Sequence, residues 1–460
     1  MRTRRWVPTL AATLALGASP AAGDDIFPYP VHEKALANGL RVVAVPYDSP
    51  GTVAYFSVVR TGSRDEVEPG KSGFAHFFEH MMFRGTERRS QAEYNDVLKR
   101  MGADSNAFTT DDYTCYYIIG PSAELATMME IESDRFQSLR YDEDAFRAEA
   151  LAVRGEYDKN ASSPFLPMWE RMRERAFDRH TYGHTTMGYL ADIDAMPDQF
   201  EYSLSFFDRF YRPENVVLLV VGDVEPESVF EMAATHYAGW ERGYQPPAVV
   251  AEPPQGERHE DQLEWPSPIR PHLMMGFRAP AFSDSSPETA TLDVISQLLF
   301  SESAPLYQTL VVDEQWVDFV QGSYSDHRDP YLFTVFARAQ SDDELAKTRE
   351  AIHEHLESLK AEPVDAERLE RIKSHLRYSL ATGLDSPGAV GFTLAGYLNL
   401  TGDPQSINRV HEQYAAITPE TIQRVAREVF TPERTTVVTL GHTAAEEAPT
   451  ETADSGEEER

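Results

Sequence analysis

The chain has 460 residues, of which 41% are hydrophobic, and a formal net charge of -33. Domains usually hold about 100–200 residues, so we expect two or more of them. The hydrophobic fraction excludes a largely disordered chain. The negative charge disfavours nucleic acid, because it would repel the phosphate backbone. It favours basic ligands through electrostatic steering, although solubility alone accounts for it equally well.

The N-terminus has the pattern of an export signal. Three arginines among the first five residues precede an apolar run over residues 6–18 and then small residues. This pattern predicts a signal peptide over 1–23, and hence a periplasmic protein. The Sec route is favoured over the Tat route, because the pair Arg4–Arg5 is common by chance. The run is too short to span a bilayer, and no other segment looks transmembrane.

Cys115 is the only cysteine. It excludes a disulfide within the chain and a structural zinc site built on cysteines. Because Cys115 stands in an apolar run, we expect it to be a buried small hydrophobic residue. Export without disulfides is typical of a large bacterial periplasmic protein that has enough core without them.

The first half of the chain alternates strand and helix patterns. The predicted strands cover 40–47, 53–60, 105–108, 113–119 and 215–221, with 105–108 at the edge of the sheet. The predicted helices cover 72–83, 91–101, 122–138, 143–159 and 226–237.

A proline-rich polar stretch, 244–268, is the predicted linker. The second half repeats the strand and helix patterns, with predicted strands at 272–277, 319–324, 331–338 and 436–440. Pro213–Asn215 and Pro432–Arg434 each precede an apolar strand that ends at a glycine, which is an internal echo. We therefore predict an α+β fold of two homologous domains, 24–243 and 269–443, each a mixed, antiparallel-rich sheet packed with helices. The acidic tail 444–460 is predicted to be disordered.

The predicted helix 72–83 carries His76, Glu79 and His80. The two histidines are four residues apart, so they project from one helix face and can bind a single Zn²⁺. Glu79 lies on the same side and can act as a general base without being a ligand. A solvated helix with incidental histidines is the alternative. The flanking pair Phe77–Phe78 disfavours this alternative. These two side chains would bury the helix, and buried imidazoles without partners are costly.

A catalytic zinc needs a third protein ligand, and the predicted helix 143–159 offers Glu149 and Glu156. They are seven residues apart and therefore share one face of the helix. One can bind zinc while the other supports a histidine ligand from behind. A solvated stripe of charges is the competing interpretation, and the spacing alone favours it over a metal site.

The two motifs together resemble the pitrilysin/insulinase zinc peptidases, family M16. Four residues match that family's second motif, namely Phe146, Glu149, Val153 and Glu156. The resemblance extends over nearly the whole mature chain, and the length is similar to the two-domain branch, M16B, that contains mitochondrial processing peptidase. It implies that each domain is an α/β roll.

The resemblance implies a role for each site residue. His76, His80 and Glu156 would bind one Zn²⁺ per chain, Glu79 would be the general base, and Glu149 would assist catalysis from behind the ligands. The substrate would be an unfolded peptide in a closed chamber. It would add as a β-strand to the edge strand that holds Asn106, Ala107 and Phe108.

The chain departs from the family in its second half. An arginine and a tyrosine seven residues apart usually help to hold the substrate and the developing oxyanion. Here those positions fall on Val312 and Phe319. We therefore expect the zinc subunit of a heterodimer whose homologous partner carries the Arg/Tyr pair, and a homodimer is less favoured. A non-catalytic scaffold subunit is the alternative function, and the intact zinc set argues against it.

Overall fold

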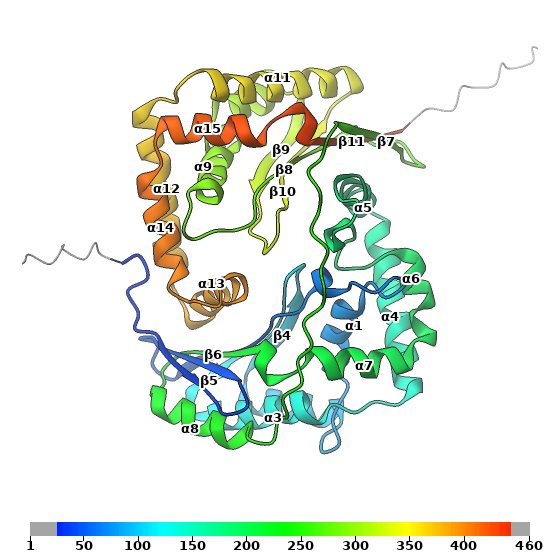
Figure 1. Cartoon of the computed structure of the whole chain (residues 1–460), viewed down its shortest axis with the longest axis vertical. Coiled ribbons are helices and arrows are strands. Elements are labelled where there is room, and N and C mark those ends of the chain that lie inside the picture. The colour runs from blue at the N-terminus through cyan, green and yellow to red at the C-terminus, as the bar shows by residue number, and fades with distance from the viewer. Residues whose placement is uncertain (1–24, 443–460) are drawn as a thin grey trace, which may run out of the picture.

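The computed structural model describes residues 25–442 (Figure 1). The predicted signal peptide, 1–23, and the predicted tail, 444–460, lie outside the described residues. Within the described part of the chain, no helix is both long and apolar enough to cross a membrane. Cys115 is fully buried, as its apolar neighbours predict.

The first half forms a six-stranded sheet in the order β1-β2-β6-β3-β5-β4. Its strands are β1 His32–Ala35, β2 Arg41–Pro46, β3 Thr52–Val59, β4 Asp104–Thr109, β5 Thr114–Pro121 and β6 Val216–Gly222. The pair β2–β6 is parallel and the remaining pairs are antiparallel. The apolar strands β3 and β6 are central because both of their faces are covered. The polar strand β4 lies at the edge, as predicted.

The second half forms a five-stranded sheet in the order β7-β11-β8-β10-β9. Its strands are β7 His259–Glu264, β8 His272–Arg278, β9 Val317–Tyr324, β10 Leu332–Ala339 and β11 Thr435–Gly441. The pair β7–β11 is parallel, as β2–β6 is in the first sheet, and the other pairs are antiparallel. Apart from β1, the two sheets therefore have the same topology, and the fold is a duplicated α+β architecture.

The internal echo has a structural counterpart. Pro213–Asn215 and Pro432–Arg434 each form a short 3-10 turn directly before β6 and β11. The predicted linker 244–268 needs a correction, because β7 lies within it. The strand was missed because Leu263 is its only apolar residue, so the apolar alternation that marks a half-buried strand is lacking.

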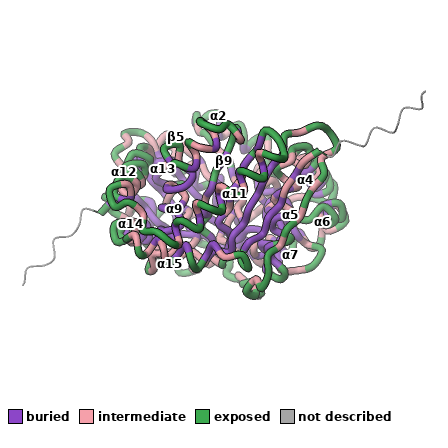
Figure 2. The backbone as a smooth tube through the Cα atoms, turned by 90° about the horizontal axis from the view of Figure 1, so that it is seen from above, coloured by how far each residue is buried: buried purple, intermediate pink, exposed green. Residues whose placement is uncertain are grey.

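Helices cover the faces of both sheets. In the first half they are α1 Phe74–Met81, α2 Gln91–Met101, α3 Leu125–Ser138, α4 Glu143–Ala161, α5 Phe165–Ala176, α6 Leu190–Ala195, α7 Phe200–Phe210 and α8 Pro226–His236. In the second half they are α9 Glu288–Phe300, α10 Pro305–Tyr307, α11 Asp342–Ala361, α12 Ala366–Gly383, α13 Pro387–Leu400, α14 Ser406–Ala416 and α15 Pro419–Val429. Buried residues follow the strands and the inner faces of these helices (Figure 2).

Each sheet takes one covering helix from the other half of the chain. Helix α5 packs on β8 and β11 of the second sheet, through Met168 and Met172. Helix α13 packs on β3 and β6 of the first sheet, through Val390 and Leu394. The strands β3 and β6 occupy the same positions in their sheet as β8 and β11 do in theirs. A domain boundary placed in the linker therefore does not separate the hydrophobic cores, because a helix from each half contributes to a core of the other half.

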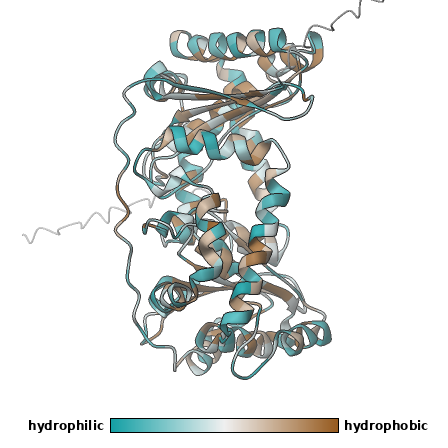
Figure 3. Cartoon of the chain, turned by 90° about the vertical axis from the view of Figure 1, so that its right-hand side faces the viewer, coloured by the Kyte–Doolittle hydropathy of each residue, from teal (hydrophilic) through white to brown (hydrophobic). Residues whose placement is uncertain are grey.

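The extended segment before β7 runs along one side of the molecule from the first half to the second (Figure 3). Glu252 attaches it to the first half by accepting the backbone N–H groups of Asp178, Arg179 and His180 at 2.8–2.9 Å. The linker is therefore held in place by three hydrogen bonds to the turn that follows α5.

Candidate metal centre

Helix α1 positions the histidine pair. Its apolar side chains, among them Phe74, Phe77 and Phe78, are fully buried, so the orientation of the helix is fixed by packing. The helix begins after Gly73, whose φ of 91° needs a residue without a Cβ. The buried carboxylate of Glu66 accepts the N–H groups of Gly73 and Ala75 at 2.8 and 2.7 Å, which satisfies two of the free donors at the helix start.

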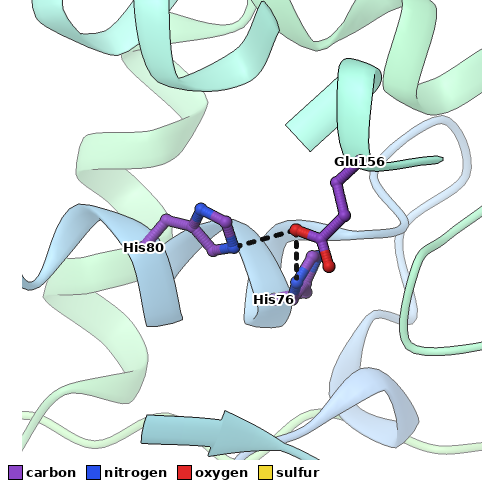
Figure 4. A group of neighbouring side chains, drawn as sticks. All are labelled: His76, His80 and Glu156. Carbon is purple, nitrogen blue, oxygen red and sulfur yellow. Dashed lines mark ion pairs between the residues drawn. The ribbon is translucent and has the colours of Figure 1, made fainter. Parts of the chain in front are cut away.

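The structure brings His76, His80 and Glu156 together (Figure 4). Glu156 Oε2 lies 3.8 Å from His76 Nε2 and 3.4 Å from His80 Nε2. One donor atom from each residue lies within 4.8 Å of the others. With Zn–N bonds of about 2.0–2.1 Å, two ligands of a tetrahedral zinc lie roughly 3.3 Å apart. The three side chains therefore fit one zinc ion after a small contraction.

The protonation of the histidines is also suited to a metal. Burial, with the neighbouring His80 as a second cause, lowers the pKa of His76 to about 4. His76 is therefore a neutral imidazole at neutral pH, as a metal ligand must be. The hydrogen bond with Glu149 raises the pKa of His80 above its usual value, so a metal at this residue has to displace a proton in mildly acidic solution.

Glu149 lies behind the histidines. Its Oε1 accepts from His80 Nδ1 at 2.9 Å, which leaves Nε2 of that ring facing Glu156. Arg84 also donates to Glu149. Burial raises the pKa of Glu149, but the bond from His80 and the charge of Arg84 bring it below its usual value. The two glutamates that the sequence left equivalent therefore stand in different places, with Glu156 beside the histidine nitrogens and Glu149 behind His80.

Glu79 stands outside the ligand cluster. Its Oε2 accepts a hydrogen bond from Thr109 Oγ1 at 2.6 Å. Burial raises the pKa of Glu79, and the bond from Thr109 opposes that shift. Glu79 is thus an ionisable carboxylate next to His80 in the chain and outside the group of possible metal ligands.

The predicted substrate residues Asn106, Ala107 and Phe108 lie on the edge strand β4. Asn106 is exposed, whereas Ala107 is buried in the core. Among the described strands, β4 pairs with β5 alone, so its other side can accept an added strand through the main chain. Thr109 ends the same strand, which connects this edge directly to Glu79.

The positions that the family gives to arginine and tyrosine are apolar and accessible. Val312 is 49% exposed and Phe319 is 39% exposed. Neither side chain can donate a hydrogen bond to an oxyanion.

Sequence reasoning missed a buried ionic network beside β4. Asp111, in the turn after β4, accepts from Arg173 of α5 at 2.8 Å and from His327 of the β9–β10 loop at 2.9 Å. Arg173 also donates to Tyr331. These residues are far apart in the sequence and have no motif spacing, so no pattern could have connected them. The network ties the second half of the chain to the turn beside Glu79.

A histidine pair and a glutamate held on two helices, next to an edge strand and inside a duplicated α+β fold, define the M16 type of peptidase chain. The comparisons with known proteins agree with this class. The insulinase family, peptidase family M16, matches residues 42–189, and the M16 inactive domain matches residues 200–376. The chain belongs to the M16 family.

Its relatives are similar over most of their length. The zinc protease PqqE of Helicobacter pylori is 29% identical over 443 residues, which cover 93% of this chain and 96% of the relative. The uncharacterized zinc protease YmxG of Bacillus subtilis is 25% identical over 399 residues, covering 86% and 94%. A crystal structure of a protease from Helicobacter pylori has a TM-score of 0.84 and 28% identity, and covers 90% of this chain and 99% of that chain.

Proposed function

We propose that this chain is a zinc-dependent endopeptidase that cleaves unfolded peptides. The observation that carries the proposal is the convergence of His76, His80 and Glu156 within 4.8 Å, with Glu79 outside the cluster and held by Thr109. A binding site alone needs no such carboxylate. The zinc proteases among the relatives support the same reaction class.

The chain's own residues have distinct roles in the reaction. His76, His80 and Glu156 would hold one zinc ion, which supplies Lewis acidity toward a carbonyl and lowers the pKa of water. Glu79 takes the proton from the attacking water and delivers it to the leaving amine. Glu149 keeps His80 in the tautomer whose Nε2 faces the metal. The edge strand β4 aligns the peptide through its main chain, so the enzyme makes little demand on sequence.

We propose further that the chain is the zinc subunit of a heterodimer. Val312 and Phe319 offer the oxyanion no donor at these two positions, and a homologous subunit that carries the Arg/Tyr pair would supply one. The test is peptide cleavage by the purified chain with and without such a subunit. We expect cleavage only from the pair, and full activity of the isolated chain contradicts the heterodimer. A homodimer would show itself as activity that depends on the concentration of the single chain.

A non-catalytic scaffold subunit remains the second candidate, and the apolar residues at the Arg/Tyr positions are the observation that favours it. Glu79→Gln separates the two candidates, because it removes the base and keeps the metal ligands. Loss of cleavage in the assembled complex supports the peptidase. Unchanged activity shows that Glu79 has no hydrolytic role.

The location and the substrate preference are proposals of the same kind. The basic and apolar N-terminal residues support export to the periplasm, and cell fractionation with a C-terminal tag tests this. The net charge of -33 supports a preference for basic peptides through steering. Cleavage of matched basic and acidic peptides at low and high salt tests it, and equal rates at low salt contradict it.

A further inference from the structure

A second cavity lies away from the metal centre, on the face of the second sheet that α5 covers only in part. Its volume is about 440 Å³. Aromatic side chains line it from both sides, namely Phe165 and Trp169 of α5 and Phe319 and Phe336 of the sheet. In Figure 1 this region lies between α5 and the strands β9 and β10.

Residues 25–442, the part of the chain that the structure describes, leave this aromatic cavity open. Phe165 is 47% exposed and Phe319 is 39% exposed. Both rings contact Phe336 edge-on or tilted, with centroid distances of 5.6 and 5.7 Å. Under α5 the same sheet face is buried, as Met274 shows. Uncovered aromatic rings gathered around a hollow are typical of a binding site rather than of an ordinary surface.

The polar residues around the cavity select against a charged ligand. Arg338 is the only charged residue in the lining. Its guanidinium is paired with Asp318, with Nε 2.9 Å from Oδ1 and Nη2 3.0 Å from Oδ2. The remaining polar lining residues, Gln321, Ser323 and Thr334, are neutral. An apolar ligand therefore gains burial and breaks no ion pair.

The aromatic cavity shares part of its lining with a second, larger cavity. Phe165, Trp169 and Thr334 also line a larger cavity of about 930 Å³ between the two halves of the chain. That larger cavity is bounded by Lys159 and Asn160 of α4. Lys159 follows Glu156 by three residues, roughly 4.5 Å along the helix. A peptide that passes Glu156 can therefore extend through the larger cavity to the aromatic one.

We infer that this cavity is a side-chain subsite, which binds a large apolar, preferably aromatic, residue of the peptide at a distance from the scissile bond. The inference rests on the proposed peptidase function and names the side chain that the enzyme selects. Phe165 and Phe319 are its specificity-determining residues. The volume suits one or two side chains. A second subunit would instead need a surface of about 800 Å² per partner. Phe319, which cannot serve an oxyanion, forms a wall of this subsite.

The test is binding without turnover. Zinc-loaded full-length Glu79→Gln chain is titrated with a labelled Ser/Ala/Gly peptide that carries one phenylalanine at successive positions, and with the peptide that has alanine there. Fluorescence anisotropy gives Kd. We expect about tenfold tighter binding when phenylalanine stands at one distance from the peptide's centre, because burying a Phe side chain is worth at least that factor.

Two pocket variants and a matched control decide the outcome. Phe319→Ser removes one wall, Thr334→Trp fills the cavity, and Leu204→Ser removes an apolar side chain of similar exposure, 41%, from α7. The inference predicts that both pocket variants lose the phenylalanine preference and that Leu204→Ser keeps it. A preference that survives in both pocket variants overturns the inference. The inference is also overturned if the pocket variants change the oligomeric state and keep the phenylalanine preference, because the cavity would then hold a second subunit. Peptides that bind with no preference remove the subsite and leave the peptidase. Absence of any peptide binding, by the chain alone and by the chain together with a homologous subunit, removes both.

Discussion

Thr109 donates its hydroxyl hydrogen to Glu79 across 2.6 Å, and thereby joins the edge strand β4 to the proposed general base. One hydrogen bond thus connects the strand proposed to align the peptide with the residue proposed to transfer a proton, although the sequence analysis placed the two in separate motifs. Under the proposed function, a peptide added to β4 would lie beside Thr109, the residue that positions Glu79, and its scissile bond would be aligned with the base.

Thr109→Val is expected to shift the pH dependence of cleavage. The hydrogen bond stabilises the ionised carboxylate and opposes the rise that burial gives to the pKa of Glu79, so its removal raises that pKa further. Glu79 acts as a base only when ionised. The acid limb of kcat/KM therefore moves to higher pH, while Thr109→Ser keeps the limb near its original place. A limb that stays in place or moves to lower pH in Thr109→Val contradicts this role.

Glu149→Gln is expected to weaken zinc binding without removing a ligand. The carboxylate accepts from His80 Nδ1 at 2.9 Å and is itself held by Arg84. Loss of such a supporting group usually lowers metal affinity about 10–100-fold. Competition with a chelating dye measures the affinity. Arg84→Met should cause a smaller loss in the same direction, and wild-type affinity in both variants argues against this support.

The stability that His327 contributes should depend on pH in a defined direction. Burial lowers the pKa of His327, but the hydrogen bond and charge of Asp111 raise it above the usual value. A raised folded-state pKa stabilises the protein below the unfolded value, about 6.5, and the contribution disappears as pH rises through the folded value. Burial raises the pKa of Asp111, but the charge of Arg173, the hydrogen bond from His327 and the charge of His327 hold it below its usual range. Asp111 therefore stays ionised in this pH window.

We expect the Tm difference between wild type and His327→Gln to be largest near about pH 5 and to shrink toward about pH 9. Thermal unfolding over this pH range measures it. A difference that grows with pH contradicts the assignment of the proton to His327.

The packing of α13 on the first sheet can be tested through two glycines of one helix. A Cβ added at Gly391 would lie 2.0 Å from Cε2 of Phe56 in β3, whereas one added at Gly396 would meet nothing within 4 Å. Gly391→Ala should destabilise the protein by about 1–3 kcal/mol. Gly396→Ala should stabilise it by about 0.5–1 kcal/mol. Denaturant unfolding measures the free energy of unfolding of both variants. Equal effects would mean that α13 of the second half does not pack on the first sheet.

The sequence predicted most of the local structure and the residues of the metal cluster. The spacing of His76 and His80 defines a helix face, and the predicted helix 91–101 and edge strand 105–108 agree with α2 and β4. The parts that were missed depend on long-range packing. β7 lacks an apolar alternation, and the place of α5 on the second sheet has no local signal. Arg84 and the pair Asp111–Arg173 depend on the approach of distant segments, for which composition and periodicity give no information.

We propose that His76, His80 and Glu156 form one zinc site per chain. The most direct measurement is the zinc content of the purified chain after dialysis, by elemental analysis, for wild type, His80→Ala and Glu156→Gln, with folding checked by circular dichroism. Such a site predicts one zinc per wild-type chain, none in His80→Ala and a strongly reduced content in Glu156→Gln, with all three folded. Folded variants that retain zinc at the wild-type level would contradict it.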